Sequence, residues 1–136
     1  MKNILIAGAG NIGFWYLMAI VSTKIKANIF IYDKSQYQIT KFKNRIKLDK
    51  KNLNYFTKLK QIPKKLDLVI ISTTSTRRYD LTKLISEKYK VKNFIVEKIV
   101  ERSPKKLVEF LKLSKKINIY VSLPFRASKF FNYIKK

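Results

Sequence analysis

The stretch that decides the fold is a glycine turn, Gly8-Ala9-Gly10-Asn11-Ile12-Gly13. It follows a short apolar run, residues 3–7, that ends at glycine as a buried parallel strand does. It precedes residues 14–21, a run rich in helix formers and closed by Ser22 and Thr23. A strand, a glycine turn and a helix in this order predict the start of a parallel α/β sheet.

Each glycine of the turn has its own task in this interpretation. Gly8 permits the tight turn, Gly10 lets a pyrophosphate approach the backbone, and Gly13 lets the helix pack against the strand. Asn11 and Ile12 belong to the same predicted phosphate site, where free N–H groups and the positive end of a helix attract the negative charge. The turn therefore predicts dinucleotide binding, with a purely structural glycine turn as the alternative.

Strands and helices alternate along the rest of the chain. Further strands are predicted at residues 28–32, 53–56, 66–72, 94–96 and 117–122, and helices at 35–48, 80–90 and after Ser103-Pro104. Connections too long for hairpins force parallel pairing with right-handed crossovers and helices on both faces. The expected fold is a single doubly wound α/β sheet of the Rossmann type, whose ligands lie at the carboxyl ends of the strands.

Composition excludes several classes of protein. The 136 residues include 46% apolar residues and only three glycines and three prolines, so we expect a folded chain. With no cysteine and no histidine, we expect no disulfide, no thiolate nucleophile and no metal site. The longest apolar run, residues 12–21, is about half of the roughly twenty needed to span a bilayer, and no signal-peptide pattern opens the chain. We expect a cytoplasmic protein without a membrane partner.

The formal net charge of +23 has two interpretations. Lysine greatly outnumbers arginine, and isoleucine, asparagine, tyrosine and phenylalanine are abundant, which is the bias that AT-rich codons produce. The alternative is a surface that binds a polyanion. The sequence carries no recognised nucleic-acid-binding motif, so a nucleic acid is not the expected partner.

Asp33 bears on the choice of cofactor. It ends a predicted strand twenty residues after Gly13, where a carboxylate can accept both ribose hydroxyls and repel a 2'-phosphate. This favours NAD over NADP. Lys34 and Lys41 could still receive that phosphate, and Asp33 could instead be only a helix cap.

Two further strand ends carry the segments Ser72-Thr73-Thr74-Ser75-Thr76-Arg77-Arg78 and Phe94-Ile95-Val96-Glu97-Lys98. With the glycine turn and the acidic residue, this order resembles the N-terminal half of the Gfo/Idh/MocA oxidoreductases, across essentially the whole chain. The resemblance implies that Thr73 and Thr74 lie along the cofactor. It also implies that Glu97 belongs to the cofactor site and that Lys98 is the candidate catalytic residue, near the nicotinamide and the hydroxyl being oxidised.

Three residues depart from the family pattern. Thr74 stands where the family usually has proline, Arg78 where histidine is usual, and Ile99 where proline follows the lysine. The first two are interpreted as loop adjustments, and the third as a change in the backbone that aims Lys98. Arg126 resembles the family's arginine at the crossover into a second domain, and a linker or capping role is equally compatible.

Length is the largest departure, because family members continue into an α/β domain that binds substrate and often makes oligomer contacts. We therefore expect a Rossmann domain at residues 1–122 and a crossover segment at 123–136, without the C-terminal substrate domain. The expected function is NAD(P) binding for an oxidoreductase of sugars, nucleotide sugars or polyols that is not catalytically complete alone. Its aromatic tail predicts a homo-oligomer or contact with a missing second domain. The alternatives are a non-catalytic NAD-sensing module and a basic nucleic-acid-binding protein.

Overall fold

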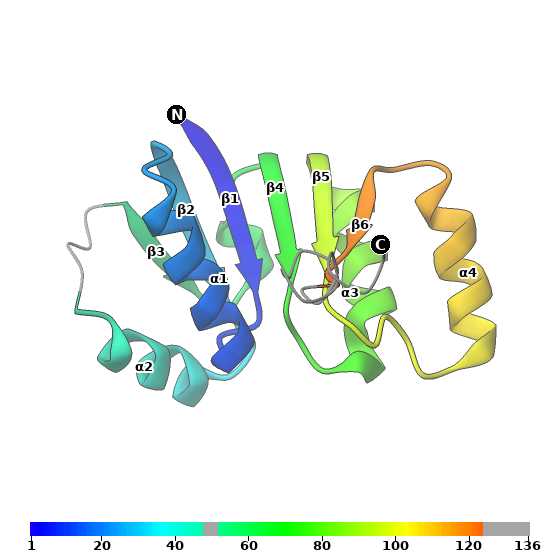
Figure 1. Ribbon diagram of the computed structural model, residues 1–136, viewed down its shortest axis with the longest axis horizontal. Coiled ribbons are helices and arrows are strands. Elements are labelled where there is room, and N and C mark those ends of the chain that lie inside the picture. The colour runs from blue at the N-terminus through cyan, green and yellow to red at the C-terminus, as the bar shows by residue number, and fades with distance from the viewer. Residues whose placement is uncertain (48–51, 124–136) are drawn as a thin grey trace, which may run out of the picture.

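A computed structural model describes residues 1–47 and 52–123. Its six strands form one parallel sheet in the order β3-β2-β1-β4-β5-β6 (Figure 1). The strands are β1 Lys2–Ala7, β2 Ala27–Tyr32, β3 Leu53–Phe56, β4 Lys65–Ile71, β5 Lys90–Val96 and β6 Ile119–Val121. The helices are α1 Asn11–Ser22, α2 Gln36–Arg45, α3 Arg78–Lys88 and α4 Pro104–Ser114, with 3-10 turns η1 Leu59–Gln61 and η2 Ser75–Arg77. The predicted doubly wound sheet is confirmed.

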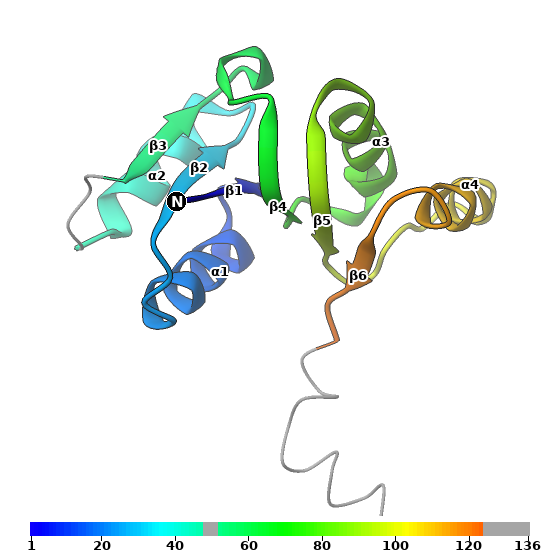
Figure 2. The ribbon, with the colours of Figure 1, turned by 90° about the horizontal axis from the view of Figure 1, so that it is seen from above.

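The two faces of the sheet bury different side chains, because successive residues of a strand point to opposite sides. Ile4 and Ile6 of β1 pack with Leu17 of α1 and with Ile39 and Phe42 of α2 on one face. The other face packs residues of β1, β4 and β5 against α3 and α4, among them Leu5, Val69, Ile85, Phe94 and Phe110. Figure 2 shows α1 and α3 on opposite sides of the sheet.

Two element boundaries differ from the sequence-based expectation for identifiable reasons. Helix α1 begins at Asn11 rather than after Gly13, because the Gly10 carbonyl accepts the Phe14 N–H at 3.0 Å and the glycine turn supplies the first helical turn. Lys90 was expected in a helix but begins β5, where its N–H donates to the Lys64 carbonyl at 2.8 Å. Pairing with β4 thus outweighs the helical pattern there.

The start of α4 agrees with expectation, whereas two other elements are shorter than expected. Helix α4 has Ser103 as its N-cap and Pro104 at its first position, and the Ser103 hydroxyl accepts the Lys106 N–H. Helix α2 ends at Arg45 and β6 covers only Ile119–Val121, both shorter than expected. The expected crossover segment with Arg126 lies, beyond Leu123, outside the described residues. Within the described part of the chain, every helix is too short or too polar to cross a bilayer.

Candidate dinucleotide-binding site

The glycine turn is held tightly against the end of β4. Gly8 has φ +119°, and a Cβ built there would lie 2.8 Å from the Ser72 carbonyl carbon. The Ser72 hydroxyl donates to the Gly8 carbonyl at 3.0 Å and to the Ala7 carbonyl at 3.2 Å. Only glycine combines this backbone conformation with so close an approach.

The other two glycines differ sharply in their surroundings. A Cβ on the buried Gly13 would lie 2.1 Å from the Gly8 carbonyl oxygen, so α1 can sit on the turn only without a side chain there. A Cβ on Gly10 would meet nothing within 4 Å. Gly13 therefore serves packing, whereas Gly10 faces open space at the N-terminus of α1.

Asp33, at the end of β2, joins the glycine turn to the turn that follows β2. Its Oδ2 accepts the Ala9 N–H at 3.0 Å and its Oδ1 accepts the Ser35 N–H at 2.9 Å. The N-cap of α2 is Ser35, whose hydroxyl accepts the Gln38 N–H at 3.3 Å. Asp33 is thus not the helix cap, and each carboxylate oxygen keeps a lone pair for a further donor such as a ribose hydroxyl.

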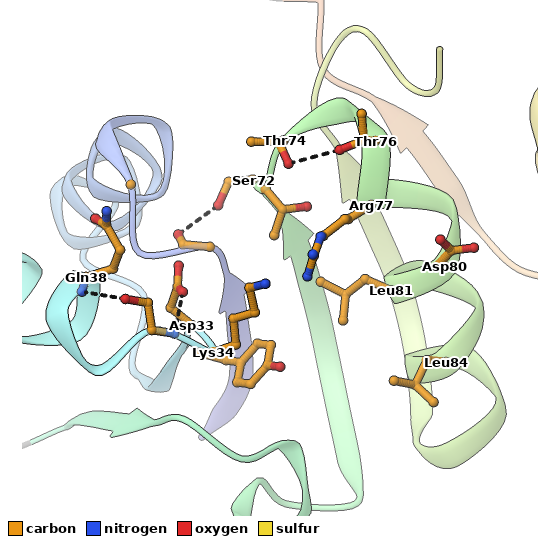
Figure 3. Close-up of a pocket in the computed structure, with 15 residues that line it drawn as sticks. Asp33, Lys34, Gln38, Ser72, Thr74, Thr76, Arg77, Asp80, Leu81 and Leu84 are labelled. Atoms are coloured by element: carbon orange, nitrogen blue, oxygen red, sulfur yellow. Dashed lines mark hydrogen bonds between the residues drawn. The ribbon is translucent and has the colours of Figure 1, made fainter. Parts of the chain in front are cut away.

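A cleft of about 1020 Å³ opens along the carboxyl ends of β1, β2 and β4. In Figure 3, Asp33, Lys34 and Gln38 face Ser72, Thr74, Arg77 and Leu81 across it. The cleft is lined by Gly8, Gly10, Tyr32, Asp33, Lys34, Ser35, Gln38, Ser72, Thr73, Thr74, Thr76, Arg77, Asp80, Leu81 and Leu84. It combines an apolar end with charged and hydroxyl groups beside a helix N-terminus, which suits a ligand that carries both an aromatic base and phosphates.

A second pocket of about 260 Å³ adjoins the main cleft and shares Gly10 and Gln38 with it. It is lined by Ala9, Gly10, Asn11, Gln38, Lys41, Phe42 and Arg45. Arg45 Nη1 donates to Asn11 Oδ1 at 2.8 Å, and the guanidinium lies 4.0 Å from the centre of the Phe14 ring. Asn11 and Lys41 therefore face this pocket rather than the main cleft.

The end of β5 forms a separate polar cluster behind the cleft. Glu97 is buried, and its Oε1 accepts a 2.5 Å hydrogen bond from the Tyr16 hydroxyl of α1. Burial and the neighbouring Glu97 raise the pKa of Tyr16 to about 12, so the hydroxyl stays a donor throughout the neutral range. The next residue, Lys98, is exposed and precedes a cis peptide bond to Ile99.

Arg78 was interpreted from the sequence as a loop adjustment, and that interpretation is wrong. Its side chain is only 7% exposed, and no other Lys or Arg among the described residues is buried. Nε donates to the Thr73 carbonyl at 3.0 Å and Nη1 donates to the Ile99 carbonyl. Burial lowers the pKa of Arg78, while the nearby Glu97 and Glu101 oppose that shift. Arg78 thus ties the turn after β4 to the turn after β5.

The structure brings together six of the residues predicted for the site. Gly8, Gly10, Asp33, Lys34, Thr73 and Thr74 line the main cleft. Ile12 is exposed, and neither it nor Gly13, Glu97 or Lys98 lines either pocket. Thr73 also buries a hydroxyl oxygen that has no hydrogen-bond partner among the described residues.

Sequence reasoning missed Tyr16, Arg78 and Glu101. Tyr16 lies in an apolar run that reads as helix core, and Glu101 lies in a short polar loop. Glu101 is buried, and its Oε1 accepts the Arg102 N–H at 2.8 Å. Of these three residues, only Arg78 had a signal in the sequence, namely that it replaces the histidine that is usual in the family.

A doubly wound parallel sheet, with a glycine turn after its first strand and an acidic residue after its second, defines a Rossmann-type dinucleotide-binding domain. Residues 2–124 match the family model described as "Oxidoreductase family, NAD-binding Rossmann fold", and the chain belongs to this Gfo/Idh/MocA family. NAD is accordingly its cofactor class. No curated protein matches the chain significantly.

Solved structures share the fold at low sequence identity. A myo-inositol 2-dehydrogenase from Lactobacillus plantarum aligns with TM-score 0.78 and 16% identity, covering 98% of this chain and 40% of its own. A scyllo-inositol dehydrogenase from Lactobacillus casei, with bound NAD(H) and scyllo-inositol, aligns with TM-score 0.73 and 15% identity. The alignment covers 99% of this chain and 40% of the dehydrogenase. The WlbA dehydrogenase from Bordetella pertussis, in complex with NADH and UDP-GlcNAcA, aligns with TM-score 0.72 and 15% identity. The alignment covers 90% of this chain and 37% of WlbA. The chain thus spans at most 40% of these proteins' length.

Proposed function

We propose that this chain is the cofactor-binding part of an oxidoreductase that acts on a sugar, a nucleotide sugar or a polyol. Family membership supports the oxidoreductase class. The substrate class rests on the similar structures, one with bound NAD(H) and scyllo-inositol and one in complex with NADH and UDP-GlcNAcA. The proposed domain is residues 1–122, with 123–136 as the crossover segment, and the proposed place of action is the cytoplasm.

The open space at Gly10 is the observation that carries this proposal. It lies at the N-terminus of α1 and opens into the main cleft, so a pyrophosphate there would meet backbone N–H groups with no side chain in the way. Asp33, on the same cleft, would accept the hydroxyls of the adenosine ribose. A carboxylate at this place favours NAD over NADP because it repels a 2'-phosphate.

Thr73 and Thr74 would contact the cofactor on the opposite wall of the cleft. Bound NAD supplies a nicotinamide ring that accepts or donates a hydride. The exposed Lys98 would polarise or deprotonate the substrate hydroxyl in the completed enzyme, and Glu97 would hold the backbone that carries it. The chain has no histidine, so we infer that by itself it binds the cofactor and turns over little substrate.

Titration of the purified chain with NADH, followed by nicotinamide fluorescence, tests the proposal. Saturable binding that excess ADP-ribose displaces is the expected result, because ADP-ribose carries the pyrophosphate and ribose that Gly10 and Asp33 would contact. Absence of saturable binding by a folded chain would refute the site. Rapid oxidation of myo-inositol by the isolated chain with NAD would refute the inference that it is catalytically incomplete.

A further inference from the structure

Part of the positive charge of this chain lies along one edge of the sheet. Parallel strands begin at one edge of a sheet, here called the amino edge, which lies at the top of Figure 1. Ten exposed lysines lie at the starts of the strands or in the segments just before them. They are Lys2, Lys24, Lys26, Lys64, Lys65, Lys88, Lys90, Lys92, Lys115 and Lys116.

Strand register places these lysines in a row. Lys65 of β4 pairs with Lys90 of β5. Lys2 of β1 pairs with Ala27 of β2, so Lys26, the residue before Ala27, lies close to Lys2. The row crosses β2, β1, β4, β5 and the start of β6, a span of about 20 Å at the usual strand spacing. The sheet fixes the backbone of the four lysines that lie in strands, Lys2, Lys65, Lys90 and Lys92, so their charges stay together whatever the side-chain rotamers.

Carboxylates scarcely balance the amino edge. Among the described residues only Asp67 and Glu87 lie there. Asp67 accepts the Asn3 N–H and lies 2.9 Å from Lys92 Nζ, so it neutralises part of the row locally. The other carboxylates of the sheet ends lie at the opposite, cofactor-binding edge, namely Asp33, Asp80, Glu97 and Glu101.

Side chains around the row indicate the kind of polyanion. Large exposed apolar residues near it are limited, within the described chain, to Met1, Val21 and Ile25. The exposed aromatic residues lie elsewhere, Trp15 and Tyr37 on helices α1 and α2 and Tyr120 inside β6. A surface with little to insert into lipid and no exposed ring for stacking on bases suits the phosphates of a duplex.

We propose that the amino edge is a binding surface for duplex nucleic acid, which it holds through backbone phosphates without reading the sequence. The surface lies at the end of the sheet opposite the dinucleotide cleft, so both ligands bind at once. This proposal is independent of the proposed enzymatic function.

Two variants of equal charge test it, each with four substitutions to glutamine at exposed positions whose side chains make no hydrogen bond or ion pair among the described residues. The amino-edge variant changes Lys26, Lys65, Lys90 and Lys116. The control variant changes Lys58, Lys83, Arg102 and Lys105, which lie away from the amino edge. The measurement is fluorescence anisotropy of a labelled 20-base-pair DNA duplex at several salt concentrations, with NADH affinity measured on each variant.

We expect salt-dependent duplex binding by the unaltered chain that excess NADH does not displace. The amino-edge variant should bind at least tenfold more weakly, with a shallower dependence of log K on log salt, since each lost phosphate contact reduces that slope by about 0.9. The control variant should change by less than about threefold, and both should keep their NADH affinity.

An equal loss of duplex affinity in the two variants would overturn the proposal, because net charge rather than the lysine row would then determine the affinity. Competition by NADH would also overturn it, since the duplex would then occupy the cofactor cleft. So would absence of duplex binding while vesicles with phosphatidylserine are bound, because the partner would then be a membrane.

Discussion

The Tyr16 hydroxyl donates a 2.5 Å hydrogen bond to the Glu97 carboxylate and so joins α1 to the end of β5, 81 residues further along the chain. Arg78 lies beside the same carboxylate and binds the carbonyls of Thr73 and Ile99. The helix after the glycine turn, the turn after β4 and the turn that carries Lys98 are thereby fixed to one another. The cluster of Tyr16, Arg78 and Glu97 thus joins three segments next to the cleft.

The raised pKa of Tyr16 predicts a loss of stability at alkaline pH. Its pKa rises from 10.0 in a free tyrosine to about 12 in the fold, so above pH 10 the unfolded chain loses a proton that the folded chain keeps. The stabilisation is therefore complete below pH 10 and is lost as the pH rises toward 12. Because the Tyr16 ring is partly exposed, we expect a loss of about 1 kcal/mol.

Urea unfolding at pH 9 and pH 11 measures this loss. Tyr16→Phe should be less stable than the unaltered chain at pH 9. Between pH 9 and pH 11 it should lose less stability than the unaltered chain does. Tyr37→Phe serves as the control, since the Tyr37 side chain is 70% exposed, and should behave like the unaltered chain. The same pH dependence in all three proteins would show that Tyr16 does not contribute.

Substitutions at two glycines should separate ligand binding from folding. Gly10→Val is expected to abolish NADH binding while the fold remains, because its Cβ meets no protein atom within 4 Å and enters the space for the pyrophosphate. Gly13→Ala is expected to destabilise the fold by several kcal/mol, because its Cβ would lie 2.1 Å from the Gly8 carbonyl oxygen. NADH fluorescence and thermal unfolding measure the two effects. Unchanged NADH affinity in a folded Gly10→Val protein would remove Gly10 from the site.

Asp33→Asn should narrow or reverse the preference for NADH over NADPH. The amide keeps an oxygen for the Ala9 N–H but loses the negative charge that repels a 2'-phosphate. Competitive titration of both cofactors gives the dissociation constant for NADPH divided by that for NADH. This ratio should be at least fivefold lower in the variant than in the unaltered chain. A ratio equal to that of the unaltered chain would leave Asp33 with only its structural bonds to Ala9 and Ser35.

Arg78→Met should destabilise the fold by about 3 kcal/mol, because it leaves the buried Glu97 and Glu101 without their cation. Arg78→Lys should recover only part of this loss, since an ammonium group cannot reproduce the fork that binds two carbonyls. The neighbouring Arg77 is exposed, so Arg77→Met should change the free energy of unfolding by less than about 0.5 kcal/mol. Denaturant unfolding compares the three proteins, and equal stabilities for Arg78→Met and Arg77→Met would contradict the assigned role.

Local sequence patterns determined most of the fold. The glycine turn, the β-branched run of β4 and the Ser103-Pro104 cap each act within a few residues, and each lies in the structure where its pattern predicts. The same patterns placed Asp33, Lys34, Thr73 and Thr74 at strand ends, and parallel pairing gathered these ends around one cleft. Lys90 shows the limit of such patterns, since strand pairing overrode its helical context.

The sequence by itself thus determined the strand–turn–helix order, the glycine turn and the total charge of this protein. Only the tertiary structure decided that Tyr16 meets Glu97, that Arg78 spans two turns, and that ten lysines share one edge of the sheet. Glycine conformation, capping and hydrophobic periodicity are local and can be read along the chain, whereas these contacts join residues that meet only after the crossovers have aligned the strands. Register and strand order fix such meetings, and neither is encoded in any single segment.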